Sequence, residues 1–233
     1  GASMRMGNLL AGACVAVLVL SGATAWGAEV TADRLTNAGT DAEAGNWLMV
    51  GKNYNSNRFS TLNDINASNV AGLHVVTAAP LGGSEPGGFG LGSMQGTPLA
   101  DNGFLYVSDP WGTPYKFDLS DGKTAKVVWV CDTGVEKDAT MARIVSNRGL
   151  ALAGKLVITA LVTGHVVACD SETGEVVWDK TIGGEGEGFD SAPLIVGDKV
   201  LVSQAFGDWA TRGYVAALKL DSGDELWRWY SVP

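Results

Sequence analysis

Two stretches share one pattern: Val167-Ala168-Cys169-Asp170-Ser171-Glu172-Thr173-Gly174-Glu175-Val176-Val177-Trp178 and Ala216-Ala217-Leu218-Lys219-Leu220-Asp221-Ser222-Gly223-Asp224-Glu225-Leu226-Trp227. Each consists of an apolar run, a polar turn that contains glycine, and a second apolar run that carries a tryptophan. A looser copy runs from Lys116 to Trp129. The tryptophans at 129, 178 and 227 are therefore each separated by 49 positions. A repeat of this length is typical of the four-stranded blade of a β-propeller.

Each repeat divides into four short apolar runs separated by polar turns. The glycines of these turns can supply the positive φ angle that a tight hairpin needs. The runs predict antiparallel four-stranded sheets, and the tryptophan after each turn is expected to pack between neighbouring blades. The blades are predicted at about 95–132, 148–182 and 191–231, in a partial all-β propeller that spans 29–233.

One further apolar run, Leu73–Ala79, precedes the first blade and is predicted as a single strand. Three blades and one strand are fewer than the four to eight blades of a closed ring. An open array leaves unpaired strand edges, which favour association. The sequence therefore predicts a fragment, or a chain that needs another copy or a complementary chain to close the propeller.

Composition agrees with an all-β protein and excludes other classes. The 233 residues include 32 glycines, about twice the usual frequency, and 46% are hydrophobic. This composition excludes a coiled coil and a disordered chain. The net charge of −9 disfavours nucleic acid as a partner, because phosphate backbones would be repelled.

The first 28 residues are interpreted as targeting sequence rather than as part of the fold. Gly1-Ala2-Ser3 ahead of Met4 is typical of an expression scar, and Arg5 is followed by an apolar run from Leu9 to Leu20. This run is too short to span a membrane and is typical of a signal peptide. Cleavage after Ala25 fits best, with Gly27 or Ala28 as alternatives, so the mature protein is predicted to be periplasmic.

Cys131 and Cys169 would remain after removal of the signal peptide. Both lie in apolar runs that read as strands, which favours two separate buried thiols. An oxidising compartment would also permit a disulfide, and their spacing does not decide between the two.

Several motifs carry a family resemblance. They are Asn57-Arg58-Phe59-Ser60-Thr61-Leu62, Asp64 to Val70, Gln95-Gly96-Thr97-Pro98-Leu99, Ser146-Asn147-Arg148-Gly149, Arg212-Gly213-Tyr214-Val215 and Trp227 to Pro233. Together they resemble the N-terminal half of the periplasmic quinoprotein alcohol dehydrogenases, eight-bladed propellers that bind pyrroloquinoline quinone (PQQ). The resemblance covers about Trp47 to Pro233.

The resemblance implies four cofactor-binding positions. Arg148 falls where the family places an arginine against a quinone carboxylate, a role that suits a planar bidentate donor. Gln95 stands where a glutamate usually contacts the quinone, and Asp190 where a threonine is typical. Ala142-Arg143 replaces the family's adjacent cysteines, so Arg143 is expected to stack on the quinone in their place.

The resemblance also implies a cation, Ca²⁺ or another, with Asp208 at the position of a glutamate ligand. No catalytic residue is assigned in this chain. The family's catalytic aspartate, its metal-binding asparagine and the tryptophan under the cofactor would lie beyond Pro233.

The resemblance predicts that this chain is the N-terminal portion of a periplasmic PQQ-dependent dehydrogenase. The whole enzyme would oxidise a small-molecule alcohol, and this chain alone would be inactive. The alternative is a non-catalytic propeller that serves as a binding or assembly scaffold in the envelope. Gln95, Asp190 and the missing cysteine pair favour the scaffold, whereas Arg148 and Asp208 favour the enzyme. Neither reading predicts a membrane span.

Overall fold

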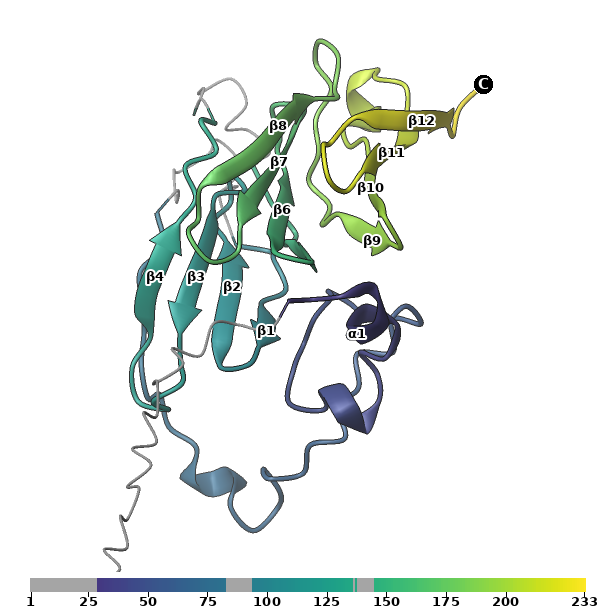
Figure 1. The fold of residues 1–233 in the computed structure, drawn as a ribbon. Coiled ribbons are helices and arrows are strands. Elements are labelled where there is room, and N and C mark those ends of the chain that lie inside the picture. The colour runs from purple at the N-terminus through teal and green to yellow at the C-terminus, as the bar shows by residue number, and fades with distance from the viewer. Residues whose placement is uncertain (1–28, 83–93, 136, 138–144) are drawn as a thin grey trace, which may run out of the picture.

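The computed structural model describes residues 29–82, 94–135, 137 and 145–233, and its strands form three antiparallel sheets that stand side by side (Figure 1). The first sheet has the order β1-β2-β3-β4, the second β5-β6-β7-β8 and the third β9-β10-β11-β12, so neighbouring strands follow one another in the chain. The bounds are β1 Leu99–Asp101, β2 Phe104–Ser108, β3 Pro114–Asp118, β4 Lys126–Val130, β5 Ala151–Ala153, β6 Leu156–Ala160, β7 His165–Asp170, β8 Val176–Thr181, β9 Leu194–Val196, β10 Lys199–Ser203, β11 Tyr214–Lys219 and β12 Glu225–Tyr230. The prediction of an incomplete propeller is confirmed: the array is open, and each repeat forms one blade.

Each of the first two blades is fastened to the next by its tryptophan. The indole Nε1 of Trp129 donates to the carbonyl of Ser171, and that of Trp178 donates to the carbonyl of Leu220, both at 3.1 Å. Each ring covers the turn glycine of the next blade: a Cβ at Gly174 would lie 2.8 Å from Trp129, and one at Gly223 would lie 2.6 Å from Trp178. Both turns therefore need glycine, for its positive φ and for the space that the ring takes.

The third tryptophan of the repeat differs from the first two. Trp129 and Trp178 are each 7% exposed, whereas Trp227 on β12 is 46% exposed. The expectation that all three pack between blades therefore holds for two of them. Trp227 lies on the outer face of the last sheet in the described structure, and no following blade covers it.

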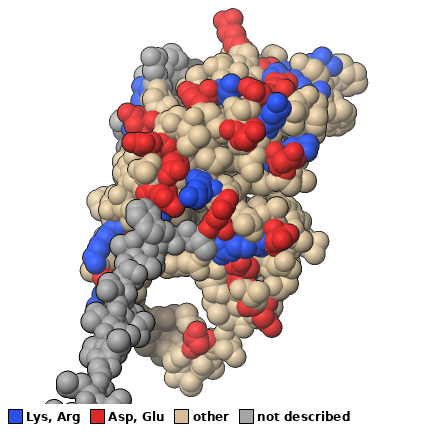
Figure 2. All heavy atoms as spheres, in the orientation of Figure 1, with Lys and Arg blue, Asp and Glu red and all other residues tan. Residues whose placement is uncertain are grey.

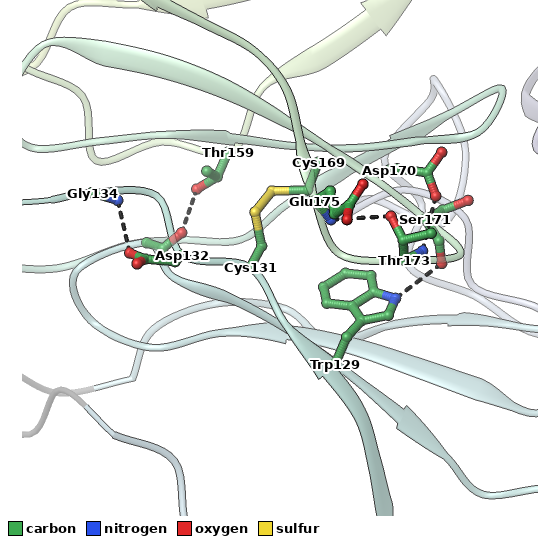
Figure 3. The surroundings of a disulfide bond; sticks show 11 residues. Trp129, Cys131, Asp132, Gly134, Thr159, Cys169, Asp170, Ser171, Thr173 and Glu175 are labelled. Atoms are coloured by element: carbon green, nitrogen blue, oxygen red, sulfur yellow. Dashed lines mark hydrogen bonds between the residues drawn. A yellow bond between two sulfur atoms is a disulfide. The ribbon is translucent and has the colours of Figure 1, made fainter.

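A disulfide joins the first two blades, so the expectation of two separate thiols was wrong (Figure 3). Cys131 directly follows β4, and Cys169 lies in β7 of the next sheet. Their Cα atoms are 6.4 Å apart, within the usual range for a disulfide. The sequence spacing of 38 residues could not reveal this proximity, because it depends on how one blade lies against the next.

The N-terminal segment packs on the inner strands, an arrangement that the repeat pattern did not predict. It contains α1 (Ala32–Thr36) and η1 (Asp41–Glu43), whereas η2 (Val70–Gly72) lies farther along the chain and has no buried residue. Val30 pairs with Gly154 beside β5, and Trp47 pairs with Ala100 of β1. Arg34 strengthens this packing by ion pairs to Glu43 and to buried Asp101, each at 2.7 Å.

The predicted strand Leu73–Ala79 does not form. The segment is extended but has no ladder partner, and Val75 within it is 83% exposed. In Figure 1 the chain before it arcs away from the sheets, and Figure 2 shows open space beside this arc. A strand requires backbone hydrogen bonds to a neighbour, and within the described residues none joins this segment to a sheet; its Thr77 Oγ1 accepts instead from the N–H of Ala125 at 3.3 Å.

Figure 2 also shows acidic and basic side chains interspersed over the visible face. Among the described residues, no helix has the length and apolar character needed to cross a membrane.

Candidate functional site

The candidate residues lie on segments that meet at one end of the blades. Because neighbouring strands are antiparallel, the segments that lead into β1, β5 and β9 lie at the same end as the connection between β10 and β11. We call this the starting end of the array. Gln95, Arg148 and Asp190 lie on the three leading segments, and Asp208 lies on the connection.

Arg148 is positioned by its two neighbours in the chain. The buried side chain of Asn147 accepts hydrogen bonds from Ser108 Oγ at 2.6 Å and from the N–H of Gly149 at 3.0 Å, and it donates to the carbonyl of Ala160 at 3.1 Å. Gly149 has a φ of +133° and pairs with Thr97 of the first blade. Asn147 thus ties the first blade to the second and fixes the backbone on which Arg148 stands.

Arg148 and Asp190 form an ion pair between the second and third blades. The guanidinium Nη1 lies 2.6 Å from Asp190 Oδ2, and the N–H of Arg148 donates to the carbonyl of Asp190 at 2.8 Å. Ser191 Oγ donates to the other carboxylate oxygen at 3.1 Å. The Arg148 side chain is 52% exposed, so it can still reach a ligand while Asp190 holds one of its nitrogens.

A hollow of about 320 Å³ opens beside this ion pair. Its walls come from the inner strands β5 and β9 and from the N-terminal segment, and they include Leu48, Val50, Ala151, Pro193 and Ile195. Two arginines are among the residues that line it, Arg148 and Arg58. Apolar walls with a few convergent polar groups are characteristic of small-molecule sites, and this volume is at the lower end of their range.

Gln95 and Arg143 are the two remaining candidates for cofactor binding. Gln95 is exposed and lies four positions before β1, and the hollow is lined without it. Arg143 lies outside the described residues, so its predicted stacking on a quinone stays a prediction.

Asp208 is exposed on the short helix η4 (Gly207–Trp209). The residues on either side of this helix, Phe206 and Ala210, both have positive φ angles, of 68° and 65°. Within the described ranges, no group of three or more His, Cys, Asp or Glu side chains could hold a metal ion. A hard cation such as Ca²⁺ takes six to eight oxygen ligands, so Asp208 would be only one of those that it needs.

The donor chemistry fits a carboxylate-bearing quinone better than it fits a cation. A half-exposed arginine beside an apolar hollow can donate to a carboxylate while the walls contact a planar body. Two contributors were missed from the sequence. The Asn147 network could have been anticipated from its place next to Arg148, but Arg58 meets Arg148 only through the folding of the N-terminal segment onto the inner strands.

The chain is similar in sequence to known dehydrogenases. The family described as glucose/ethanol/alcohol dehydrogenase, β-propeller domain, matches residues 47–233. Among curated proteins, the chain is 33% identical to the putative dehydrogenase XoxF of Paracoccus denitrificans, over 97% of this chain and 36% of that protein. It is 31% identical to the quinohemoprotein alcohol dehydrogenase ADH IIB of Pseudomonas putida, over 83% of this chain and 27% of that protein.

Solved structures show the same likeness. The quinohemoprotein alcohol dehydrogenase ADHIIG of Pseudomonas putida superposes with a TM-score of 0.78 at 27% identity, over 89% of this chain and 29% of that chain. A europium-containing methanol dehydrogenase superposes with a TM-score of 0.73 at 30% identity, over 85% of this chain and 34% of that chain. The chain spans about a third of the length of the curated relatives that it matches.

Proposed function

The chain belongs to the glucose/ethanol/alcohol dehydrogenase β-propeller family, and from this membership we propose that it is the N-terminal portion of a periplasmic PQQ-dependent dehydrogenase that oxidises an alcohol. The observation that supports the proposal most is the family match over 47–233, together with an exposed arginine at the starting end beside a ligand-sized hollow. The relatives are named as alcohol or methanol dehydrogenases, and the substrate class is taken from them.

In this proposal Arg148 binds the cofactor. Its guanidinium would donate to a carboxylate of the quinone, with Asp190 orienting the side chain and Asn147 holding the backbone. Gln95 would offer an amide contact from the first blade, and Arg143 would stack on the quinone. The bound quinone supplies the oxidant that accepts a hydride from the alcohol.

The same proposal assigns no proton acceptor to this chain. Asp208 would give one oxygen ligand to Ca²⁺ or another cation, and the other ligands would have to come from elsewhere. Catalysis needs base, cofactor and substrate held together, so we expect the isolated chain to bind PQQ without turning over an alcohol. A second copy or a complementary chain is proposed to close the propeller.

The test is a titration of the purified chain with PQQ, followed by calorimetry and by the absorbance of the quinone, with and without Ca²⁺. We expect saturable binding that is lost in Arg148→Gln. Lys126→Gln is the matched control, because it removes the same charge from an exposed position on β4, in a sheet of which Arg148 is not part. Absence of binding by the unaltered chain would refute the cofactor assignment and would favour the non-catalytic envelope scaffold.

A further inference from the structure

The candidate cofactor residues carry an unfavourable charge for their proposed ligand. PQQ has three carboxylates, whereas the cofactor and metal candidates placed by the structure comprise one cation, Arg148, and two anions, Asp190 and Asp208, with neutral Gln95. Asp190 already neutralises Arg148 at 2.6 Å. A polyanionic ligand therefore needs a further positive group at this site.

Arg58 meets this need from the N-terminal segment. Arg58 lines the same hollow as Arg148. Among the residues that the structure describes, the Arg58 guanidinium forms no ion pair or hydrogen bond, and the side chain is exposed. Its charge is thus not neutralised in the way that Asp190 neutralises Arg148.

The backbone at Arg58 is held in an unusual conformation. Arg58 has a φ of +50°, Ser56 one of +52° and Lys52 one of +71°, although none of them is glycine. Left-handed backbone costs roughly 1–2 kcal/mol per residue and persists only where the surroundings fix it. Such residues are enriched at ligand sites, which makes this loop a candidate.

The contacts that fix the loop are present. The buried Lys52 Nζ donates to the carbonyls of Glu43, at 2.8 Å, and Asn46. Asn53 Oδ1 accepts from the N–H of Asn55 at 3.1 Å, and the N–H of Arg58 donates to the carbonyl of Gly51 at 3.1 Å. These contacts fix the backbone from which the exposed Arg58 side chain extends.

We propose that Arg58 is a second cationic binding residue for the cofactor, so that Arg58 and Arg148 take different carboxylates of the quinone across the hollow. The inference rests on the proposed function and deepens it. The apolar walls between the two arginines would contact the planar body of the ligand, and Arg58 would supply the net positive charge that the Arg148–Asp190 pair lacks.

The experiment measures PQQ affinity by calorimetry for the unaltered chain and for Arg58→Gln, Arg58→Lys, Arg148→Gln and Lys126→Gln, each first shown to be folded by its thermal transition. We expect Arg58→Gln to weaken binding about tenfold and to make it less sensitive to salt, because one charged contact is lost. Arg58→Lys keeps the charge and should restore part of the affinity, whereas Lys126→Gln should bind as the unaltered chain does.

The outcomes separate the two proposals. If Arg148→Gln loses binding while Arg58→Gln binds with unaltered affinity and salt dependence, the role of Arg58 is refuted and the cofactor site stands. If the unaltered chain does not bind PQQ, the proposed function fails and the role of Arg58 fails with it. Equal losses in Arg58→Gln and Lys126→Gln would also overturn the inference, because they would show a general charge effect.

Discussion

Cys131 and Cys169 connect the first blade to the second covalently, beside a joint that also carries the hydrogen bonds of Trp129 and Lys116 to the carbonyl of Ser171. Both sulfurs are fully buried, and 38 residues separate the two positions. The bond therefore closes a long loop in the unfolded chain, where it restricts more conformations than in the folded one.

The first prediction concerns this bond. Replacing both cysteines by alanine should lower the free energy of unfolding by about 4 kcal/mol, from the closure entropy of a loop of this length. Thermal unfolding followed by circular dichroism measures the loss. The unaltered chain unfolded in reductant is the control and should show a similar decrease. If neither the double substitution nor the reductant changes the melting temperature, the two thiols do not pair in solution.

The second prediction concerns the glycine under Trp178. Gly223→Ala places a Cβ 2.6 Å from the indole at a φ of +73°, so we expect a loss of about 2–4 kcal/mol from backbone strain and overpacking together. Gly197→Ala is the matched control: its φ is +59° and nothing lies within 4 Å of the added atom, so only about 1–2 kcal/mol should be lost. Denaturant unfolding compares them, and equal losses would mean that the indole does not cover this turn.

The third prediction concerns a buried carboxylate in the first blade. Burial raises the pKa of Asp109, even though its side chain accepts the N–H groups of Trp111 and Thr113 at 2.9 Å. The stability that the neutral form contributes is complete below the unfolded-state pKa and is lost as the pH rises through the higher folded-state pKa.

Asp109→Asn keeps an acceptor for both N–H groups but has no charge to bury. The variant and the unaltered chain should therefore be close in stability in strong acid, and the variant should gain relative to the unaltered chain as the pH rises toward neutrality. Urea unfolding at a series of pH values measures this difference. A difference that shrinks with rising pH would contradict the raised pKa.

The fourth prediction concerns Asp190. Asp190→Asn removes the carboxylate that neutralises Arg148, so the affinity for PQQ should rise up to about tenfold, as expected when a competing anion is removed from an exposed pair. The folding free energy should change by less than about 1 kcal/mol, because the Arg148 side chain is half exposed. Asp198→Asn, which breaks an exposed pair with Lys199, is the control. Weaker binding by Asp190→Asn would indicate that Asp190 orients Arg148 more than it competes with the ligand.

Much of the fold could be predicted from the sequence because each blade is locally determined. The turn glycines and the regular tryptophans predict three four-stranded repeats, and the described residues form three four-stranded sheets. Leu73–Ala79 has the same apolar character but forms no strand, since pairing depends on a neighbour that local sequence does not report.

Less of the candidate site could be predicted, because its contacts join positions far apart in the chain. Arg148 was found through its motif, but its pairing with Asp190 depends on how the second and third blades lie together. Arg58 belongs to a motif that marks the family, yet its place at the hollow follows from the packing of the N-terminal segment on β5 and β9. The Cys131–Cys169 bond was missed for the same reason.

The Trp129–Gly174 and Trp178–Gly223 contacts have an evolutionary consequence. The first two units each carry a tryptophan that packs on the next unit, and the last two each carry the turn glycine that receives it. A tandem gene duplication would therefore deliver a unit that can already pack against both of its neighbours. Propellers of different blade number can then arise by copying alone. Within the described residues the disulfide lies at the first of the two joints, so the covalent link is not part of the repeated unit.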